Sequence, residues 1–311
     1  MTGFGIRMEE GDEDMNKKIG SRYLPYCFLT PAIVFLLLFM AYPILNVFYY
    51  SLQNYATNKP YLRGLGGLDN MMKILTGDKV FRASLLVSVK WVVVQVGLQL
   101  VFGLMIALVL NQRFKGRGIL RAIVFAPWAV SGVLTSMMWS LMYNENMGVV
   151  NDLLMKMGII KKGIAWISGY GTSFAALTVA ELWRGIPFFA IMLLAGLQSI
   201  PDEEYEACSV DGGTRWSKFL YITLPHLKET IVLSTLLRAV WEFNNVDVIY
   251  NLTGGGPVNR TMTLTMYITQ TAIRDSNFGY GSAIAVISFI ILAVFAAVYI
   301  KLTGFGEEER A

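Results

Sequence analysis

The stretch EEYEACSVDGG, residues 203–213, is a short polar segment with a long apolar segment on each side. With Asp202 before them, Glu203 and Glu204 form an acidic run that suits the first turn of a helix, where negative charge meets the positive end of the helix dipole. A helix this polar does not enter lipid, because its charged side chains would lose their water. The stretch therefore predicts a short helix outside the membrane, and it fixes where the neighbouring apolar segments must stop.

Both ends of this helix are marked in the sequence. Ser199 can cap a helix that starts at Pro201, since proline is favoured at the first helical position. Gly212 and Gly213 can end the helix, because glycine adopts a positive φ at little cost.

A second short helix is predicted directly after the glycines. Thr214 can cap it, and Pro225 is expected to break it just before the next apolar segment. It contains Trp216, Phe219 and Ile222. The region of about residues 199–225 is then a helix–turn–helix. It suits the groove of a soluble partner protein, but propensity alone favours a simple surface helix equally.

Composition places the rest of the chain in a membrane. Of the 311 residues, 55% are hydrophobic and 15% are charged, and the mean hydropathy is +0.50. A soluble domain carries about 25% charged residues, and apolar runs of about 20 residues are long enough to cross a bilayer. The two cysteines lie far apart, the histidine is single, and the charge of +4 is spread over loops. No disulfide framework, metal site or nucleic-acid partner is therefore expected.

We predict an all-α integral membrane protein with six transmembrane helices. Their approximate bounds are 24–50, 85–110, 119–143, 174–197, 229–252 and 282–302. Pro25, Pro31 and Pro43 mark the start of the first span and a kink within it. An even number of spans puts both termini on one side. Residues 1–23 and 305–311 are then tails on that side, and residues 24–304 form the membrane domain.

The charges of the loops indicate which side that is. The link NQRFKGRGILR, residues 111–121, carries four basic residues and no acid, which places it in the cytoplasm. The loop after the first span is also basic and weakens this assignment. Because the link is denser in charge, we predict both termini in the cytoplasm. Residues 146–171 are then an external interfacial helix and loop.

Several of these segments resemble one family. The motif E-A-C, then D-G-G, then F and I-T-L-P, resembles the cytoplasmic signature of bacterial ABC importer permeases, whose usual form is E-A-A, three residues, G, nine residues, I-x-L-P. The matching positions are Glu206, Ala207, Cys208, Asp211, Gly212, Phe219, Ile222, Leu224 and Pro225. Cys208 and Gly213 depart from that form by small-for-small changes. Residues 30–44, 183–201, 252–257 and 278–286 resemble the carbohydrate, maltose-type branch, so the resemblance covers nearly the whole chain after residue 22.

The resemblance implies that ATP is hydrolysed by another subunit. This chain has no G-x-x-x-x-G-K-[ST] motif to cradle the phosphates of ATP. We therefore expect a non-catalytic chain without a cofactor, with ATP and Mg²⁺ on a separate ATPase subunit. In the family, a cleft of the ATPase receives the helix that carries Glu206, and closing of the paired ATPases moves it. The coupling residues implied are Glu206, Ala207, Asp211, Gly212 and Pro225.

The same resemblance implies further partners. They are a second, similar permease chain, two ATPase subunits and an external substrate-binding protein, all at a bacterial cytoplasmic (inner) membrane whose lipid surrounds the spans. The two permease chains would enclose a cavity near the membrane midplane that opens to alternate sides.

Polar residues within the predicted spans indicate where that cavity lies. A charged side chain at mid-bilayer costs about 2.5–3.5 kcal/mol on insertion scales, so it should face protein or water. Glu181 could pair with Arg184 along the fourth span, and Arg238 with Glu242 along the fifth. Alternatively, these residues line the substrate path. The resemblance to the maltose-type permease implies for that path Arg184, Gly185, Phe188, Arg238, Trp241, Glu242 and Asn245, of which the last four share one helix face.

The sequence leaves the substrate open, with a sugar or oligosaccharide as the main prediction. Two arginines favour an acidic saccharide or a polyol such as glycerol phosphate, because arginine binds carboxylate and phosphate with two hydrogen bonds. Glu242 opposes this, since it would neutralise Arg238. A membrane enzyme is disfavoured, because the chain has one histidine and neither an H-E-x-x-H nor a G-x-S-x-G motif. An ATP-independent carrier or channel would not need the helix that carries Glu206.

Overall fold

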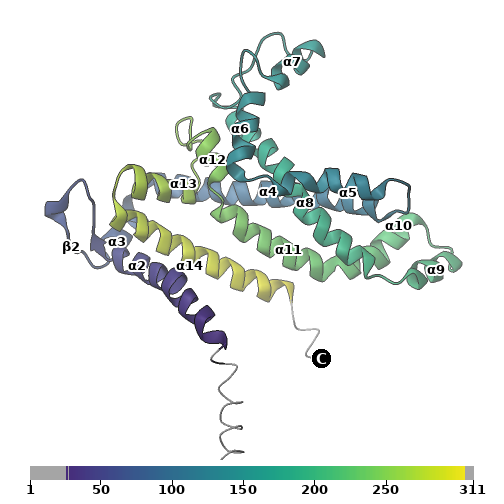
Figure 1. The fold of residues 1–311 in the computed structure, drawn as a ribbon, viewed down its shortest axis with the longest axis horizontal. Helices are drawn as coiled ribbons and strands as arrows, with labels where there is room; N and C mark the ends of the chain where they lie inside the picture. The colour runs from purple at the N-terminus through teal and green to yellow at the C-terminus, as the bar shows by residue number, and fades with distance from the viewer. Residues whose placement is uncertain (1–25, 27, 305–311) are drawn as a thin grey trace, which may run out of the picture.

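Four long helices that run side by side make up the body of the molecule. The computed structural model describes Tyr26 and residues 28–304, and the predicted tails lie outside this part of the chain. The four helices are α4 (Lys79–Asn111), α8 (Ser173–Gln198), α11 (Leu224–Asn244) and α14 (Phe278–Thr303) (Figure 1). The contact between α4 and α8 is the most extensive in the fold, and α11 packs against both.

Shorter elements extend from this body. Before α4 come η1 (Leu37–Ala41), α2 (Tyr42–Ser51), β1 (Gln53–Asn54), η2 (Pro60–Leu62), β2 (Gly64–Leu65) and α3 (Asp69–Gly77). The two strands pair antiparallel, with Gln53 opposite Leu65. Between α4 and α8 lie α5 (Arg117–Phe125), η3 (Ala126–Ala129), α6 (Gly132–Met142) and α7 (Val149–Lys156). The remaining elements are α9 (Asp202–Val210), α10 (Arg215–Lys218), η4 (Phe219–Thr223), α12 (Asp247–Leu252), α13 (Leu264–Thr269) and η5 (Gln270–Arg274).

Apolar side chains fill the spaces between these helices. The largest buried cluster lies mainly between α4, α8 and α11, where Leu110, Phe189 and Leu227 have no exposed surface. A second cluster joins α4, α8 and α12 around Trp91, and a third joins α4, α13 and α14 around Ile284. Many large apolar side chains of α4 and α14 are instead exposed on the outside of the body. A surface of this kind is suited to lipid.

Four helical stretches of the described chain are long and apolar enough to cross a membrane. They are Phe28–Ser51, Lys79–Asn111, Ser173–Gln198 and Phe278–Thr303, which correspond to the predicted first, second, fourth and sixth spans. The pair Arg117–Ala129 and Gly132–Met142 would be a fifth if its two halves are counted together. The helical, membrane-spanning architecture is therefore as predicted.

The predicted third span is not one continuous helix. The chain bends by 99° between Ala129 and Gly132. Pro127 lies in the 3-10 turn before the bend, and Val130 is extended with ψ of 128°. The α-helical ladder therefore stops there, and α6 starts afresh with a cap from Ser131, whose hydroxyl accepts a hydrogen bond from a backbone N–H of α6.

The predicted fifth span also ends earlier than expected. Helix α11 stops at Asn244, because Asn245 is extended with ψ of 120°. The separate helix α12 then begins at Asp247. The prediction of a helix that runs on to residue 252 is therefore wrong, and the break brings Asn245 to the end of α11.

Two prolines are accommodated by wide helical turns. The predicted break at Pro225 is wrong, since α10, η4 and α11 form one helix from Arg215 to Asn244. The π-turn η4 ends two residues before Pro225, and the π-turn η1 ends two residues before Pro43 in the first helix. A proline ring clashes with the carbonyl four residues earlier. A wider turn relieves this clash without ending the helix.

Helix α9 begins one residue later than predicted. Pro201 is its N-cap residue and makes no side-chain cap bond. The hydroxyl of Ser199 instead donates to the carbonyl of Gly196, at 2.8 Å, in the last turn of α8. The predicted cap by Ser199 is therefore wrong, because its hydroxyl is engaged by the preceding helix.

Close packing of α4 on α8 depends on Gly103. A Cβ at this position would lie 2.5 Å from Cβ of Phe189 and 3.1 Å from the backbone N of Ala190. We expect Gly103→Val to lower the apparent Tm of the purified protein, since overpacking costs about 1–3 kcal/mol. Gly97→Val is the matched control, because a Cβ on Gly97 meets nothing within 4 Å. Equal Tm values for the two variants would show that α4 and α8 do not pack in this way.

Candidate functional site

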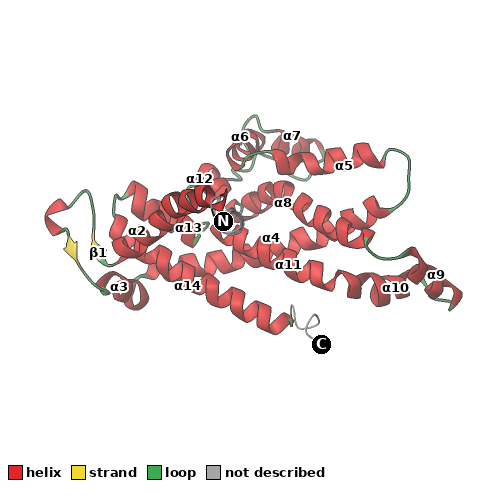
Figure 2. Ribbon diagram, turned by 60° about the horizontal axis from the view of Figure 1, so that its bottom comes forward, coloured by secondary structure: helices red, strands yellow, loops and turns green. Residues whose placement is uncertain are grey.

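The polar helix α9 lies at one end of the body, next to α10 (Figure 2). Gly212 adopts a φ of +80°, as the predicted turn requires, and the N–H of Gly213 donates to the Cys208 carbonyl at 2.8 Å. A Cβ on Gly213 would collide with Sγ of Cys208. The hydroxyl of Thr214 accepts from the Ser217 N–H at 3.2 Å, which confirms the predicted cap of the second helix.

One face of α9 is held against the body. The hydroxyls of Tyr205 and Thr223 are hydrogen-bonded at 3.0 Å, and Tyr205 and Cys208 pack on the largest buried cluster. Oε1 of Glu204 lies 3.2 Å from Nε2 of His226, but both side chains are about 40% exposed, so this contact adds little. Packing of the half-buried Tyr205 and its hydrogen bond to Thr223 therefore hold this face of α9 against the body.

The opposite face of α9 is open to solvent. The five predicted coupling residues are all exposed, namely Glu206, Ala207, Asp211, Gly212 and Pro225. Val210, one turn after Glu206, is 87% exposed. An acidic and an apolar side chain thus stand side by side on a rigid, outward-facing helix, which is a surface that a partner protein can bind.

A cavity of about 340 Å³ lies between α8, α11 and the turn η3. Its lining residues are Trp128, Arg184, Arg238, Trp241, Glu242 and Asn245. The last four are the residues that helical spacing predicts on one face, and they do line one cavity, although Asn245 follows the last residue of α11. The indole of Trp241 is 47% exposed and offers an aromatic face to whatever enters.

Four charged side chains form one buried cluster beside this cavity, here called the charge cluster: Glu181, Arg184, Arg238 and Glu242. Oε1 of Glu181 lies 2.8 Å from Nη2 of Arg184 and 3.1 Å from Nη2 of Arg238. Oε1 of Glu242 lies 2.7 Å from the same nitrogen of Arg238. Glu181, Arg238 and Glu242 are at most 6% exposed, whereas Arg184 is 21% exposed. The predicted pairing within helices is therefore confirmed, and three of the paired residues, Arg184, Arg238 and Glu242, also line the cavity.

Helix α4 completes the hydrogen bonding of the charge cluster. The amide of Gln99 accepts from Nε of Arg238 at 2.6 Å and donates to Oε1 of Glu242 at 2.9 Å. The indole N–H of Trp91 donates to Oε2 of Glu242 at 3.1 Å. Gln95 accepts a further bond from Gln99 at 3.1 Å. Buried charges are stable only when paired and hydrogen-bonded, and three helices share this task.

Two predicted path residues serve the packing of the site and do not line the cavity. Gly185 is buried, and a Cβ there would collide with the side chains of Arg238 and Gln99. Phe188 is 7% exposed, and its ring centroid lies 5.3 Å from that of Trp241. Gly185 thus leaves room for the side chains of the charge cluster, and the ring of Phe188 packs against the exposed indole of Trp241.

Sequence reasoning missed four residues of this region: Trp91, Gln95, Gln99 and Trp128. Gln95 and Gln99 are polar residues four apart in an otherwise apolar segment, so a shared inward face could have been inferred. No sequence signal places Trp128 in the cavity, since it comes from the 3-10 turn η3 between two apolar helices.

Comparison with known proteins identifies the family. Residues 99–302 match the family described as "Binding-protein-dependent transport system inner membrane component". The chain belongs to this family. As a permease of such a system, it is a membrane component of an importer that depends on a separate binding protein, and the predicted resemblance to ABC importer permeases is confirmed.

Named relatives place the permease among those for sugars. It is 35% identical over 302 residues to the trehalose/maltose transport system permease protein MalF of Thermococcus litoralis, covering 96% of this chain and 100% of the relative. It is 33% identical over 284 residues to the sulfoquinovosyl glycerol transport system permease protein SmoG of Agrobacterium fabrum, covering 91% of each chain. These relatives are transport permeases, in line with a non-catalytic chain.

A solved structure has the same fold. A chain of a bacterial alginate ABC transporter, crystallised in complex with an alginate pentasaccharide-bound periplasmic protein, superposes with a TM-score of 0.80. The match covers 92% of this permease and 96% of that chain, at 20% sequence identity. The permease fold is therefore established.

The charge balance of the cluster can be tested by paired substitutions. We expect Glu181→Gln to lower the apparent Tm of the permease clearly, because an uncompensated buried charge costs about 3–5 kcal/mol. The double variant Glu181→Gln/Arg184→Gln again has equal numbers of positive and negative groups and should regain part of the loss. A double variant less stable than Glu181→Gln would show that charge balance does not hold the cluster together.

Proposed function

We propose that this permease forms part of the path of a sugar or short oligosaccharide through an ATP-driven importer. The observation that carries the proposal is the cavity beside the charge cluster. Its volume of about 340 Å³ is in the range of small-ligand sites. The indole face of Trp241 suits the C–H surface of a sugar ring, and the amide of Asn245 suits its hydroxyls.

We propose further that the sugar is uncharged. Arg184 and Arg238 alone suggest an acidic substrate, but Glu181 pairs with both and Glu242 pairs with Arg238. The cluster is then formally neutral, so it has no excess positive charge to offer a carboxylate or phosphate. The names of the two relatives concern trehalose or maltose, which are neutral, and sulfoquinovosyl glycerol, which carries a sulfonate. Both names support a sugar over a simple polyol phosphate, and the proposal of an uncharged sugar rests on the pairing within the charge cluster.

The proposed topology keeps six spans, with both termini in the cytoplasm. Helix α11 is the fifth span despite its charged residues, because these pair inside the protein. The bent α5–α6 pair is the third. The basic link of residues 111–121 supports a cytoplasmic position for the end of α4, and α9 then projects into the cytoplasm as well.

The proposed role of α9 is to couple the permease to an ATPase. Its open face, with Glu206, Ala207, Asp211 and Gly212, would enter a cleft of that subunit, and Pro225 lies where the following helix leaves this region. We propose two such ATPase subunits, which bind ATP and Mg²⁺, a second permease chain and an external binding protein. The whole importer would lie in the cytoplasmic membrane.

Uptake by the whole importer in proteoliposomes tests this proposal. We expect labelled sugar to enter only with the binding protein outside and ATP on the side of the ATPase subunits. Glu206→Lys should lower uptake and sugar-stimulated ATP hydrolysis about tenfold or more, since a charge-assisted hydrogen bond contributes about 1.5–3 kcal/mol.

Glu145→Lys is the matched control, because Glu145 is an exposed acid before α7, far from α9 in sequence. Sugar entry without ATP would mean that the chain works as a carrier or channel. Normal coupling in Glu206→Lys would mean that α9 does not meet the ATPase in the proposed way.

A further inference from the structure

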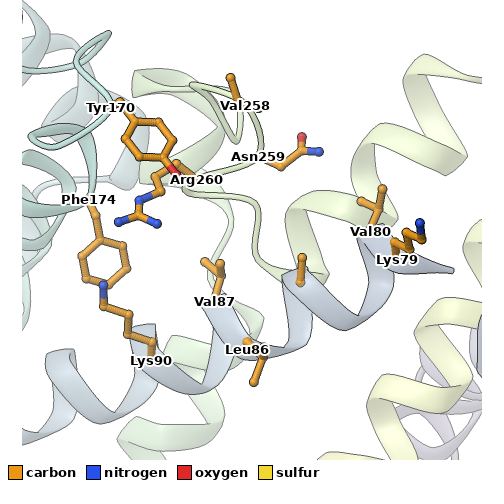
Figure 3. A pocket seen from close by; sticks show the side chains of 11 residues that line it. Lys79, Val80, Leu86, Val87, Lys90, Tyr170, Phe174, Val258, Asn259 and Arg260 are labelled. Carbon is orange, nitrogen blue, oxygen red and sulfur yellow. The ribbon is translucent and has the colours of Figure 1, made fainter.

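A second hollow lies on another side of α4 and belongs to neither region above. Its volume is about 440 Å³. The first third of α4, the residues that lead into α8, and the loop before Thr261 form its walls (Figure 3). Lys90 of this pocket precedes Gln99 by nine residues, which is two and a half helical turns, so the two side chains leave α4 in opposite directions. The pocket therefore does not open toward the charge cluster.

The lining of this pocket is strongly basic. It includes Lys79, Lys90 and Arg260 and no carboxylate. Within the described residues, none of these three cations forms an ion pair. Asp78, next to Lys79, is engaged elsewhere, since its Oδ2 accepts hydrogen bonds of 2.7 Å from two tyrosine hydroxyls. The lining thus presents three positive charges without an ion-pair partner in the described part of the chain and without a carboxylate among its residues, and this favours an anionic ligand.

Two of these cations are held on aromatic rings. Nζ of Lys90 lies 4.1 Å from the ring centroid of Phe174, and Cζ of Arg260 lies 4.7 Å from that of Tyr170. Figure 3 shows both cationic groups at the end of the pocket where the two rings lie. Cation–π contacts fix the two charges near each other. Each cation also covers one face of its ring, which leaves less aromatic surface on which a sugar could stack.

The position of the pocket along α4 matches the headgroup region of a bilayer. The 22 residues from Trp91 to Gln112 carry no charge, which is about the length needed to cross the hydrocarbon core. Lys90 is the last charged residue before this stretch, so it stands at the boundary between hydrocarbon and headgroups. Arg260, which lies at the same end of the pocket as Lys90, is then near that boundary, where lipid phosphates are found (Figure 3). Lys79 precedes Lys90 by 11 residues, which at 1.5 Å per residue places it about 16 Å further toward the water.

An apolar surface leads from the pocket toward the hydrocarbon. Leu86 lines the pocket and is 72% exposed, and Val93, two turns further along the same side of α4, is 65% exposed. Val93 borders an apolar groove of about 160 Å³ between α4, α11 and α14, to which Phe243 and Phe295 also contribute. A cationic pocket with an exposed apolar surface and an apolar groove further along the same helix fits a molecule that has an anionic head and a hydrocarbon tail.

We propose that this pocket binds the headgroup of an anionic glycerophospholipid. Lys90 and Arg260 contact the phosphate, Lys79 adds to the attraction, and an acyl chain runs along Leu86 and Val93. The site is distinct from the sugar path. With the orientation given in the proposed function, the lipid would lie in the external leaflet, and this is the one point at which the proposal rests on that function. The transport assay does not test lipid binding and the lipid test does not need transport, so failure of one can be told apart from failure of the other.

Photolabelling of the whole importer tests the proposal. The importer is placed in phosphatidylcholine nanodiscs with a small share of phosphatidylglycerol whose acyl chain carries a diazirine near its carbonyl. We expect mass spectrometry to find the label on residues 86–93. Lys90→Gln/Arg260→Gln should lower the apparent affinity about thirtyfold, which corresponds to about 1 kcal/mol for each charge near the membrane surface.

Controls separate the possible ligands. Lys161→Gln/Lys162→Gln removes two exposed cations outside the pocket and should change nothing, and Lys90→Arg/Arg260→Lys should keep the label. Phosphatidylcholine with the same diazirine chain should label these residues weakly, and inorganic phosphate should not compete. Equal labelling by phosphatidylcholine, or no loss in the glutamine variant, would overturn the proposal. Displacement of the label by inorganic phosphate would also overturn it. If Lys90→Gln/Arg260→Gln kept the label but was no longer stimulated by the binding protein, the pocket would bind a protein and not a lipid.

Discussion

The charge cluster is the interaction on which the rest of this structure depends. A single charge in the middle of a bilayer costs about 2.5–3.5 kcal/mol on insertion scales, and here four charges lie inside the body. They are tolerated because Glu181 contacts both arginines and Arg238 contacts both glutamates. Gln99 and Trp91 add hydrogen bonds from a third helix. The cluster thereby fixes α4, α8 and α11 against one another and sets the position of the cavity.

The continuous helix from Arg215 to Asn244 gives the cluster a mechanical connection to α9. At 1.5 Å per residue it is about 45 Å long. Its start lies beside α9, where Thr223 is hydrogen-bonded to Tyr205, and its end carries Arg238 and Trp241 at the cavity. A break at Pro225 would have separated these two ends. In the proposed mechanism, the π-turn before Pro225 keeps them on one helix, so a movement of α9 reaches the substrate path directly.

The sequence predicted what depends on local pattern. The long apolar runs predict α4, α8 and α14, and the two glycines at 212–213 predict the turn at Gly212. The spacing of Arg238, Trp241, Glu242 and Asn245 predicts their common face. The direction in which the chain continues after a helix, and the pairing of residues far apart in the sequence, were not predictable. Hydropathy stays high through the bend after Ala129, so nothing local places Trp128 in the cavity. The hydrogen bond from Gln99 to Glu242 joins residues 143 positions apart. A polar helix face can be predicted from the spacing, but the residue that it contacts cannot.

The charge cluster also bears on the charge of the substrate. An arginine paired with a glutamate has no net charge to offer an anionic substrate, whereas an unpaired arginine does. The most direct measurement is the ATPase activity of the reconstituted importer, with its binding protein, as neutral and acidic oligosaccharides are added in turn. With both arginines neutralised by Glu181 and Glu242, we predict stimulation by a neutral sugar. Stimulation by acidic sugars alone would contradict this, since Arg184 and Arg238 would then have to leave their glutamate partners for the substrate.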